Sequence, residues 1–315
     1  MKVSLRQLRY FVTAAQAGSI AEAARLVNVA QPSVSWAILK TEELLGVELF
    51  VRQHAKGVSL TAAGRRLLPQ AHAMLRMAEE FEAYARSQAH ELTGSLHVGC
   101  YSTLGVAYLP VIIAEFARKH PRVHIQIHED TQDGILDQLS SGMIEIALAY
   151  DVNLRDDFVK LRIRSSVPYA LLPDGHRLLQ HEAVSLSDLA DEPFILLDSV
   201  PARQYFLSLF DVVGVKPCIK HTSPSFELVR GLVSQGLGYS VLITRPLSDV
   251  TYDGLTVHPR PLSDNIPVLD MCTIRTPSSR MTRRCRAFQD VCVQLFTDQA
   301  DQSKSEALAS ERTKD

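Results

Sequence analysis

The stretch from Thr61 to about Thr93 has the pattern of one long amphipathic helix, and no other feature restricts the fold as strongly. Its apolar side chains recur at alternating spacings of four and three, typical of a seam that packs against another helix. They are Leu67, Ala71, Met74, Ala78, Phe81 and Ala85. Such a helix spans about 45–50 Å, more than a small domain can cover. We expect a dimerisation helix over 61–93. The alternative is a core helix of a larger bundle, although no long helices follow.

Residues 1–60 predict a small helical domain that ends in a hairpin. Apolar residues at helical spacing predict helices over 5–15 and 20–26. Gly18-Ser19 separates the two helices, and Glu22, three residues after the serine, completes a capping-box pattern. The local sequence therefore predicts a turn between the two helices.

A third helix is predicted over 31–45, after a short connection from the second. Pro32 suits the first turn of a helix, where its missing N–H costs nothing, and Gly46 is typical of the position just past a helix end. Two short strands, 50–52 and 58–60, predict a β-hairpin.

The charge of the chain is divided unevenly. The net charge is −2, yet residues 1–66 hold nine basic against four acidic side chains, a net +5, so the remainder carries −7. A basic segment on an acidic body is typical of a head that binds a polyanion, and a solvated surface is the alternative.

Residues 94–296 alternate between strands and helices, which predicts α/β architecture with a parallel sheet. A segment of about 200 residues of this kind usually divides into two lobes. We place lobe 1 at about 94–165 and 267–296, and lobe 2 at about 166–266. The tail over 297–315 is polar and is expected to be disordered. The predicted strands are 96–100, 123–128, 145–150, 169–172, 194–197, 239–242 and 269–274, and the predicted helices are 109–120, 133–142, 202–213 and 225–235.

The chain resembles the LysR-type transcriptional regulators over nearly its full length. The stretches that carry the resemblance are 5–11 (LRQLRYF), 18–26 (GSIAEAARL), 29–35 (VAQPSVS), 42–50 (EELLGVELF) and 60–64 (LTAAG), and beyond residue 94 they are Gly99, Leu109-Pro110, Phe116, His120-Pro121, Gly142, 172–176 and 236–239. The resemblance implies an N-terminal winged helix-turn-helix, a long linker helix and a C-terminal two-lobed α/β effector domain like a type 2 periplasmic binding protein.

The resemblance implies that the third helix enters a major groove of double-stranded DNA with its N-terminal end. Short polar side chains there can reach base edges or phosphates, although a helix cap or a solvated face is the alternative for each serine. The expected DNA-binding residues are Gln31, Pro32, Ser33, Ser35, Trp36, Lys40, Arg52 and Lys56.

Two positions depart from the family pattern. Trp36 stands where the family usually has a basic residue, and Thr41 stands where a leucine usually precedes the glutamate. Trp36 either contacts a sugar or a thymine methyl group or is the packing anchor of its helix, and the sequence leaves both interpretations open.

In folds of the effector-domain type, a ligand lies between the lobes, at strand C-termini and helix N-termini that favour an anion. The expected effector-binding residues are Ser102, Thr103, Tyr150, Asp151, Ser199, Pro201, Arg203 and Ser223. Arg203 could clamp a carboxylate with both arms of its guanidinium, or form a surface ion pair instead. Ser102 and Thr103 could cap the following helix. We expect a small carboxylate-bearing metabolite.

The family resemblance suggests a dimer and a tetramer, and RNA polymerase is a further possible partner. Lobe closure on the effector would rearrange the paired heads on DNA. The alternatives are a solute-binding sensor without DNA function and an enzyme, but GxSxG, GxGxxG after a strand and HExxH are all absent from the sequence. We expect no catalytic residues.

No cofactor or metal is expected either, because the five cysteines form no CxxC pair or zinc-ligand cluster. Cys285 and Cys292, seven residues apart, could form a redox pair or be ordinary buried thiols. No apolar run has the roughly 18–20 residues of a membrane span. The N-terminus carries charges throughout, so a cytoplasmic location with no membrane partner is expected.

Overall fold

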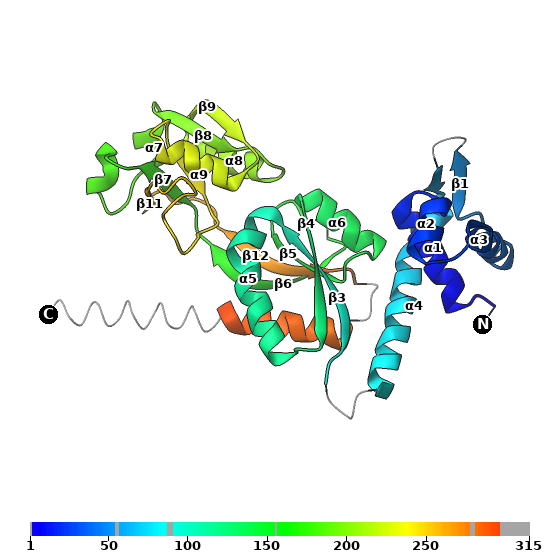
Figure 1. Ribbon diagram of the computed structural model, residues 1–315. Coiled ribbons are helices and arrows are strands. Elements are labelled where there is room, and N and C mark those ends of the chain that lie inside the picture. The colour runs from blue at the N-terminus through cyan, green and yellow to red at the C-terminus, as the bar shows by residue number, and fades with distance from the viewer. Residues whose placement is uncertain (1, 54–56, 87–90, 155, 278–280, 297–315) are drawn as a thin grey trace.

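The chain forms a helical head, one long helix and two sheet-centred lobes, with lobe 1 lying between the head and lobe 2 (Figure 1). The structure is a computed structural model that describes residues 2–53, 57–86, 91–154, 156–277 and 281–296. The head contains α1 (Leu5–Ala17), α2 (Ile20–Leu26), α3 (Gln31–Leu45), β1 (Phe50–Gln53) and β2 (Gly57–Leu60). The three helices and the hairpin lie where the sequence predicts them, within two residues at each end.

The turns of the head depend on a few local contacts. The Ser19 side chain accepts a hydrogen bond from the Glu22 N–H and so caps α2. The predicted reciprocal half of the capping box is wrong, because the Glu22 carboxylate pairs with Arg25 at 2.6 Å instead. Gly57 lies against the turn after α1, where an added Cβ would meet the Gly18 carbonyl oxygen at 2.2 Å. Only glycine therefore fits the start of β2.

Helix α3 buries one face and exposes the other. Val34, Ala37 and Ile38 lie in the head core, whereas the Trp36 residue is 66% exposed. The interpretation of Trp36 as a packing anchor is therefore wrong, since an anchor would lose most of its surface to its neighbours. Thr41 is fully buried, and its hydroxyl donates to the Ala37 carbonyl at 2.7 Å. A backbone acceptor thus satisfies the polar atom at this departure from the family pattern.

Helix α4 (Ala62–Arg86) follows the hairpin and runs beside lobe 1 (Figure 1). Its 25 residues correspond to about 37 Å. The expected helix end near residue 93 is wrong, since residues 91–93 are not helical. Leu92 packs on the core of the lobes and the Thr93 carbonyl accepts a hydrogen bond from Arg284, so the chain leaves the helical path there to enter the sheet.

The predicted seam of α4 is only partly covered within one chain. Ala71 is buried in the head core, with Leu67 packed against the same core. Further along the helix, Met74, Met77 and Phe81 are 43%, 52% and 74% exposed. A groove of about 350 Å³ lies beside this stripe, between α1, α3 and α4. The second half of α4 therefore presents an apolar face with no intrachain cover among the described residues.

Lobe 1 is built on a five-stranded sheet in the order β4-β3-β5-β12-β6. Its elements are β3 (Gly94–Tyr101), α5 (Ser102–Lys119), β4 (Val123–Asp130), α6 (Gln132–Ser141), β5 (Ile146–Tyr150), β6 (Val159–Ser166), β12 (Leu269–Arg275) and a helix over 283–296. The prediction of a parallel sheet is only partly correct. Strand β12 runs antiparallel to β5 and β6, because it re-enters the lobe from the opposite side.

Helix α5 begins seven residues before the predicted start at Leu109. Leu104, Tyr108 and Ile112 share one buried face at helical spacing, so the packing continues back to the end of β3. Phe288 of the last helix packs against Phe116 of α5, with ring centroids 5.8 Å apart. The C-terminal helix thus covers the sheet on the same side as α5.

Lobe 2 combines an antiparallel and a parallel strand set. Strand β7 is central, antiparallel to β10 and β11, and β8 pairs with β9 in parallel. A bridge between Phe194 and Tyr239 joins the two sets. The elements are β7 (Tyr169–Pro173), a 3-10 helix (Arg177–Gln180), α7 (Leu186–Leu189), β8 (Pro193–Leu197), α8 (Ala202–Val213), β9 (Cys218–Ser223), α9 (Phe226–Ser234), β10 (Ser240–Leu242) and β11 (Val257–Pro261). The chain crosses between the lobes directly after β6 and directly before β12.

Within the described ranges, no helix combines the length and hydrophobicity that a bilayer crossing requires. The same residues contain no cluster of three or more His, Cys, Asp or Glu side chains arranged to hold a metal ion.

Histidines lie where α4 meets lobe 1. Burial, with the nearby Arg76 and other imidazoles, lowers the pKa of both His72 and His97 to about 4. His97 also lies 3.0 Å from His128 between the ring nitrogens Nδ1 and Nε2. The groups that face His97 are His128, Arg76, Arg284 and His124, and those that face His72 are Arg76 and His97.

We expect acid to destabilise the fold through these histidines. An unfolded chain binds a proton at each imidazole below about pH 6.5, whereas the folded chain resists protonation until about pH 4, so stability is complete above pH 6.5 and is lost as the pH falls between these values. Thermal unfolding measured between about pH 7 and about pH 5 should show a falling midpoint. The slope should be smaller in His72→Gln and unchanged in His181→Gln, which alters an exposed histidine. Equal slopes in His72→Gln and wild type would contradict the assignment to His72.

Trp36→Ala should leave stability nearly unchanged. Because Trp36 is 66% exposed, we expect the free energy of unfolding to change by no more than about 0.5 kcal/mol in chemical denaturation. Ile38→Val in the same helix removes a buried methyl group and should cost about 1 kcal/mol. A loss of about 3–5 kcal/mol in Trp36→Ala, the range for a buried aromatic, would show that Trp36 anchors the helix after all.

Candidate functional site

The exposed face of α3 carries most of the expected DNA-contacting residues. Gln31, Pro32 and Ser33 are exposed in the first turn, with Trp36 one turn later. Ser35 is half-buried. The face is short and mostly exposed, which suits insertion into a groove.

The other expected DNA contacts are less open. Lys40 is half-buried, and its ammonium pairs with the Glu43 carboxylate at 2.9 Å. This ion pair partly neutralises the charge that Lys40 could offer to a phosphate. The backbone of Arg52 lies in β1, but its side chain and all of Lys56 fall outside the described residues.

The N-terminus of α3 has no side-chain cap. Its N-cap residue is Ala30, which offers no side-chain acceptor to the first N–H groups. Pro32 has no N–H, and the Ser33 N–H donates to the Ala30 carbonyl at 2.9 Å, so this helix start offers a phosphate chiefly the positive end of the helix dipole. The dipole and the exposed side chains therefore converge on one end of α3.

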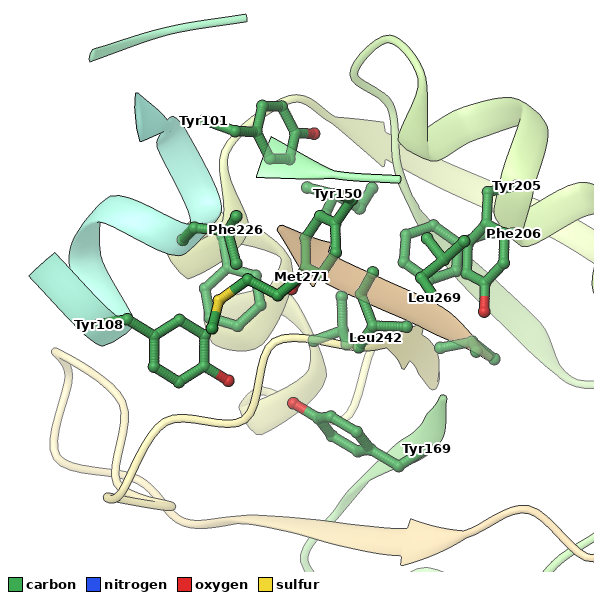
Figure 2. Packing of buried hydrophobic residues seen from close by; sticks show 14 of the residues in the cluster. Tyr101, Tyr108, Tyr150, Tyr169, Tyr205, Phe206, Phe226, Leu242, Leu269 and Met271 are labelled. Carbon is green, nitrogen blue, oxygen red and sulfur yellow. The ribbon is translucent and has the colours of Figure 1, made fainter. Parts of the chain in front are cut away.

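A second candidate site is a small cavity where the two lobes meet. Its volume is about 20 Å³, room for about one water molecule. Figure 2 shows the aromatic side chains gathered here, with Tyr150 at the centre. The described residues that line the cavity include no charged side chain; they are Tyr101, Thr103, Tyr150, Val152, Leu197, Pro201, Ala202, Tyr205, Phe206, Phe226, Leu242, Ile243, Thr244 and Leu269.

Tyrosine hydroxyls connect the lobes across this cavity. The Tyr101 hydroxyl of lobe 1 lies 2.8 Å from the Ser199 hydroxyl of lobe 2. Tyr150 of lobe 1 makes the same kind of bond to Thr244 of lobe 2, also at 2.8 Å. Burial raises the pKa of both tyrosines, so both phenols stay protonated. The polar contacts at this cavity are therefore neutral hydroxyl pairs and not ion pairs, and they lie within one apolar cluster that both lobes share.

Half of the expected effector-binding residues lie at this cavity. Thr103, Tyr150 and Pro201 line it directly. Ser199 belongs to it through its bond to Tyr101. These residues come from three segments of the two lobes, and the structure brings them together as the strand-end rule predicts.

The other four expected residues have different surroundings. Ser102 donates to the Asp130 carbonyl at 3.2 Å, in the first turn of α5 rather than before it. Asp151 pairs with Lys160 at 2.8 Å on the surface. Ser223 is buried, and its hydroxyl accepts the Ser225 N–H in the turn before α9.

Arg203 does not reach the cavity. Its guanidinium pairs with the Asp198 carboxylate at 2.7 Å and is 45% exposed. The clamp interpretation is wrong for this arrangement, and the surface ion pair is what the structure contains. The physical reason is local, because the aspartate five residues earlier offers the guanidinium a carboxylate at the surface.

The cavity also uses residues that the sequence analysis missed. Tyr101 is the last residue of β3, and Thr244 follows β10, so the strand-end rule applied to every strand would have found both. Tyr205, Phe206 and Phe226 lie inside helices, where periodicity marks them only as core residues. No local sequence pattern indicates that these residues lie at the boundary between the lobes.

Two helix N-termini meet at the cavity from opposite lobes. Helix α5 starts after Tyr101 and α8 after Pro201, and neither N-cap supplies a side-chain hydrogen bond. Helix α9, by contrast, is capped by Ser225. The two starts place positive dipole ends where the lobes meet, although the Arg203 N–H of α8 already donates to the Ser199 carbonyl at 2.9 Å.

The cysteines show no sign of thiol chemistry. Cys285 and Cys292 are free and buried, and burial raises the pKa of Cys285 to about 12. Cys100 and Cys272 are also free and buried, and Cys218 is exposed. A protonated, enclosed thiol is a poor nucleophile, so the redox-pair interpretation has no support.

Comparison with known proteins agrees with this arrangement. Residues 5–65 match the family model of the bacterial regulatory helix-turn-helix protein, lysR family, and residues 89–297 match the LysR substrate binding domain. The two models together span the head and the two lobes, whereas most of α4 lies between the two matched ranges.

Solved structures and sequence relatives of the same kind are similar over most of the chain. A LysR family regulator from Pseudomonas aeruginosa is 40% identical, with a TM-score of 0.63, over 94% of this chain and 99% of that one. HinK, a LysR family transcriptional regulator from the same organism, is 40% identical, with a TM-score of 0.62, over 93% and 98%. OxyR, a DNA-binding transcriptional dual regulator of Escherichia coli, is 29% identical over 76% and 79%.

These matches cover both ends of the molecule and the order of its parts. They make the chain a DNA-binding regulator with an effector domain and not an enzyme. The chain belongs to the LysR family of transcriptional regulators.

Proposed function

We propose that the chain binds a specific, partly palindromic promoter site through the exposed N-terminal face of α3, with residues 1–60 as the DNA-binding unit. The observation that carries this proposal is the division of α3, which buries Val34 and Ile38 but leaves Gln31, Ser33 and Trp36 in solvent. Gln31 can bond to a base edge, the uncapped helix start to a phosphate, and Trp36 to a sugar or thymine methyl group.

The effector is a small metabolite with an apolar body and one anionic group, bound between the lobes of residues 94–296. Support for the apolar body comes from the lining, in which aromatic and aliphatic side chains predominate. Support for the anionic group comes from the uncapped starts of α5 and α8, because no cationic side chain is among the described lining residues. A carboxylate would accept main-chain N–H donors there.

Effector binding requires the lobes to part. A cavity of about 20 Å³ is too small for a metabolite, so the closed arrangement excludes it. When the lobes separate, the Tyr101–Ser199 and Tyr150–Thr244 bonds break, and the freed hydroxyls can bond to the ligand. The ligand then shifts the lobe equilibrium by its difference in affinity for the two arrangements.

Self-association proceeds through residues 61–93, where Met74, Met77 and Phe81 of α4 are uncovered. Packing this stripe against a second copy buries it and pairs two heads for two half-sites. A dimer of such dimers would give a tetramer. RNA polymerase is the natural partner of a promoter-bound regulator, and such a role places the chain in the cytoplasm.

Gln31→Ala should weaken specific DNA binding without changing the fold. Fragments selected from genomic DNA by the purified protein provide the probe, and filter retention at several salt concentrations gives the affinity. Loss of one good base contact should lower affinity about tenfold while leaving the salt dependence unchanged, because no phosphate contact is removed. Gln16→Ala changes an exposed glutamine on α1 and is the matched control.

Two outcomes would contradict the proposal at different levels. Wild-type affinity in a Gln31→Ala, Ser35→Ala double variant would contradict the role of these residues. Failure of wild-type protein to enrich any fragment, with and without added metabolite extracts, would contradict specific DNA binding itself.

Tyr150→Phe should loosen the lobe contact. The change removes the hydroxyl that meets Thr244 at 2.8 Å, and the buried threonine loses this partner. We expect a loss of about 1 kcal/mol and a drop of about 2–4 °C in the unfolding midpoint of the effector domain. Tyr252→Phe, at a tyrosine that is 88% exposed, should have no effect. Equal midpoints for the two variants would argue against a closed contact at Tyr150.

A further inference from the structure

The centre of the solvent face of α3 is apolar. Pro32, Trp36 and Leu39 follow one another at spacings of four and three, so their side chains lie along one side of the helix. Trp36 and Leu39 are 66% and 49% exposed, and Pro32 is exposed as well. They lie opposite Val34 and Ile38, which are buried in the head core. We call these three exposed side chains the apolar ridge.

Polar side chains lie on both sides of the apolar ridge. At about 3.6 residues per turn, Gln31 and Ser35 fall along one side of it, and Ser33 and Lys40 fall along the other. A helix in the major groove presents the centre of its exposed face to the base edges, whereas its sides also come close to the sugar-phosphate walls. The ridge therefore faces bases more directly than sugars.

The major groove offers an apolar side chain one kind of apolar group. Base edges there present hydrogen-bond donors and acceptors, and thymine adds its C5-methyl group. 5-Methylcytosine carries a methyl group at the same ring position. When an indole covers such a methyl group, both lose apolar surface to water, which is worth about fourfold in affinity for each methyl group that is buried.

The surroundings of Trp36 favour DNA as the partner of the ridge. Among the described residues, Trp36 belongs neither to the head core nor to the lining of the groove beside α4. The segment that contains it, residues 1–66, carries a net charge of +5, which attracts a polyanion. The neutral indole stands where the LysR family usually has a basic residue, so this position cannot bind a phosphate through charge. An apolar feature of DNA is the remaining partner for it.

We propose that Trp36, with Pro32 and Leu39 beside it, reads the C5-methyl groups of pyrimidines in the major groove. The affinity of the chain for its DNA site then depends on methyl groups as well as on hydrogen bonds. Thymine supplies the methyl group in unmodified DNA, and a methylated cytosine under the ridge strengthens binding in the same way. This role of Trp36 rests on the proposed function, because α3 must enter the groove.

A comparison of thymine with uracil tests the proposal, because uracil lacks only the C5-methyl group. The fragment that wild-type protein selects from genomic DNA is prepared with either base, and filter retention gives the affinity of the full-length chain for each form. Wild type should bind the uracil form at least about fourfold more weakly. Trp36→Ala should lose most of this difference, and the four affinities together isolate the contact between indole and methyl group. Tyr252→Ala, which removes an exposed aromatic residue of lobe 2, should match wild type.

Cytosine methylation distinguishes the two sources of the methyl group. Single thymine-to-uracil replacements first locate the base pair that matters. That T·A pair is then replaced by C·G, and the cytosine is methylated at C5. Methylation should return about fourfold in affinity to wild type and little to Trp36→Ala. An equal gain in both proteins, or no gain in wild type, would overturn the reading of methylcytosine by Trp36.

The single tryptophan of the chain provides a second measurement. All indole fluorescence comes from Trp36, which is 66% exposed and therefore open to the quencher acrylamide in the free protein. Saturation with the selected fragment should protect the indole from acrylamide, because the groove then encloses the ring. Unchanged quenching would overturn the contact. This measurement uses wild-type protein, so it decides the matter if Trp36→Ala does not fold.

Two results separate the role of Trp36 from the proposed function. Wild-type protein that selects a fragment but binds its thymine and uracil forms equally overturns the methyl reading and leaves specific DNA binding in place. Equal thymine-to-uracil ratios in wild type and Trp36→Ala overturn the role of Trp36 alone. Failure to enrich any fragment, with and without added metabolite extracts, overturns both proposals.

Discussion

The arrangement of the whole molecule depends on α4, a helix too long to be covered by either structure that it touches. Its first half buries Leu68 and Ala71 in the head, and its second half meets lobe 1 through Arg76. Apolar burial fixes the first contact firmly, since each buried leucine contributes about 1.5–3 kcal/mol. A desolvated ion pair contributes little net free energy, because the loss of hydration offsets the attraction. The head therefore holds the first half of α4 through apolar burial, whereas lobe 1 meets its second half through polar groups.

Local sequence patterns identified the head almost completely, because its contacts are close in sequence. Gly18 and Gly46 end helices through their left-handed backbone, and the Ser19 side chain caps the start of α2. The sequence predicted the strands of the two lobes less completely. Strands β6 and β9 escaped detection because their side chains are mostly exposed, so no apolar run marks them. The antiparallel direction of β12 depends on a chain crossing that no local pattern encodes.

The candidate effector site also depends on contacts between distant parts of the chain, which local sequence patterns do not predict. Strand ends predicted Thr103 and Tyr150 correctly as cavity residues, since topology places strand C-termini together. The pairs that close the cavity join residues 98 and 94 positions apart. Of the two interpretations left open for Arg203, the structure contains the surface ion pair, because Asp198 is a neighbour in sequence. Residue type indicates what a side chain can bind. Only the fold determines which partner is within reach. The exposure of Trp36 likewise depends on how α3 packs in the head.

Neutral hydroxyl pairs at the lobe contact have a consequence for sensing. A hydrogen bond between two buried hydroxyls contributes only about 1 kcal/mol net, because each group would otherwise bond to water. Two such bonds join the lobes within an apolar cluster that both lobes share, and a ligand that reproduces the bonds can replace them at small cost. Ion pairs across the same gap would be strongly favoured or strongly disfavoured, depending on solvation. Because the lobe contact is uncharged, a ligand with an apolar body and hydrogen-bonding groups can replace it, and the ligand shifts the lobe equilibrium by its difference in affinity for the two arrangements.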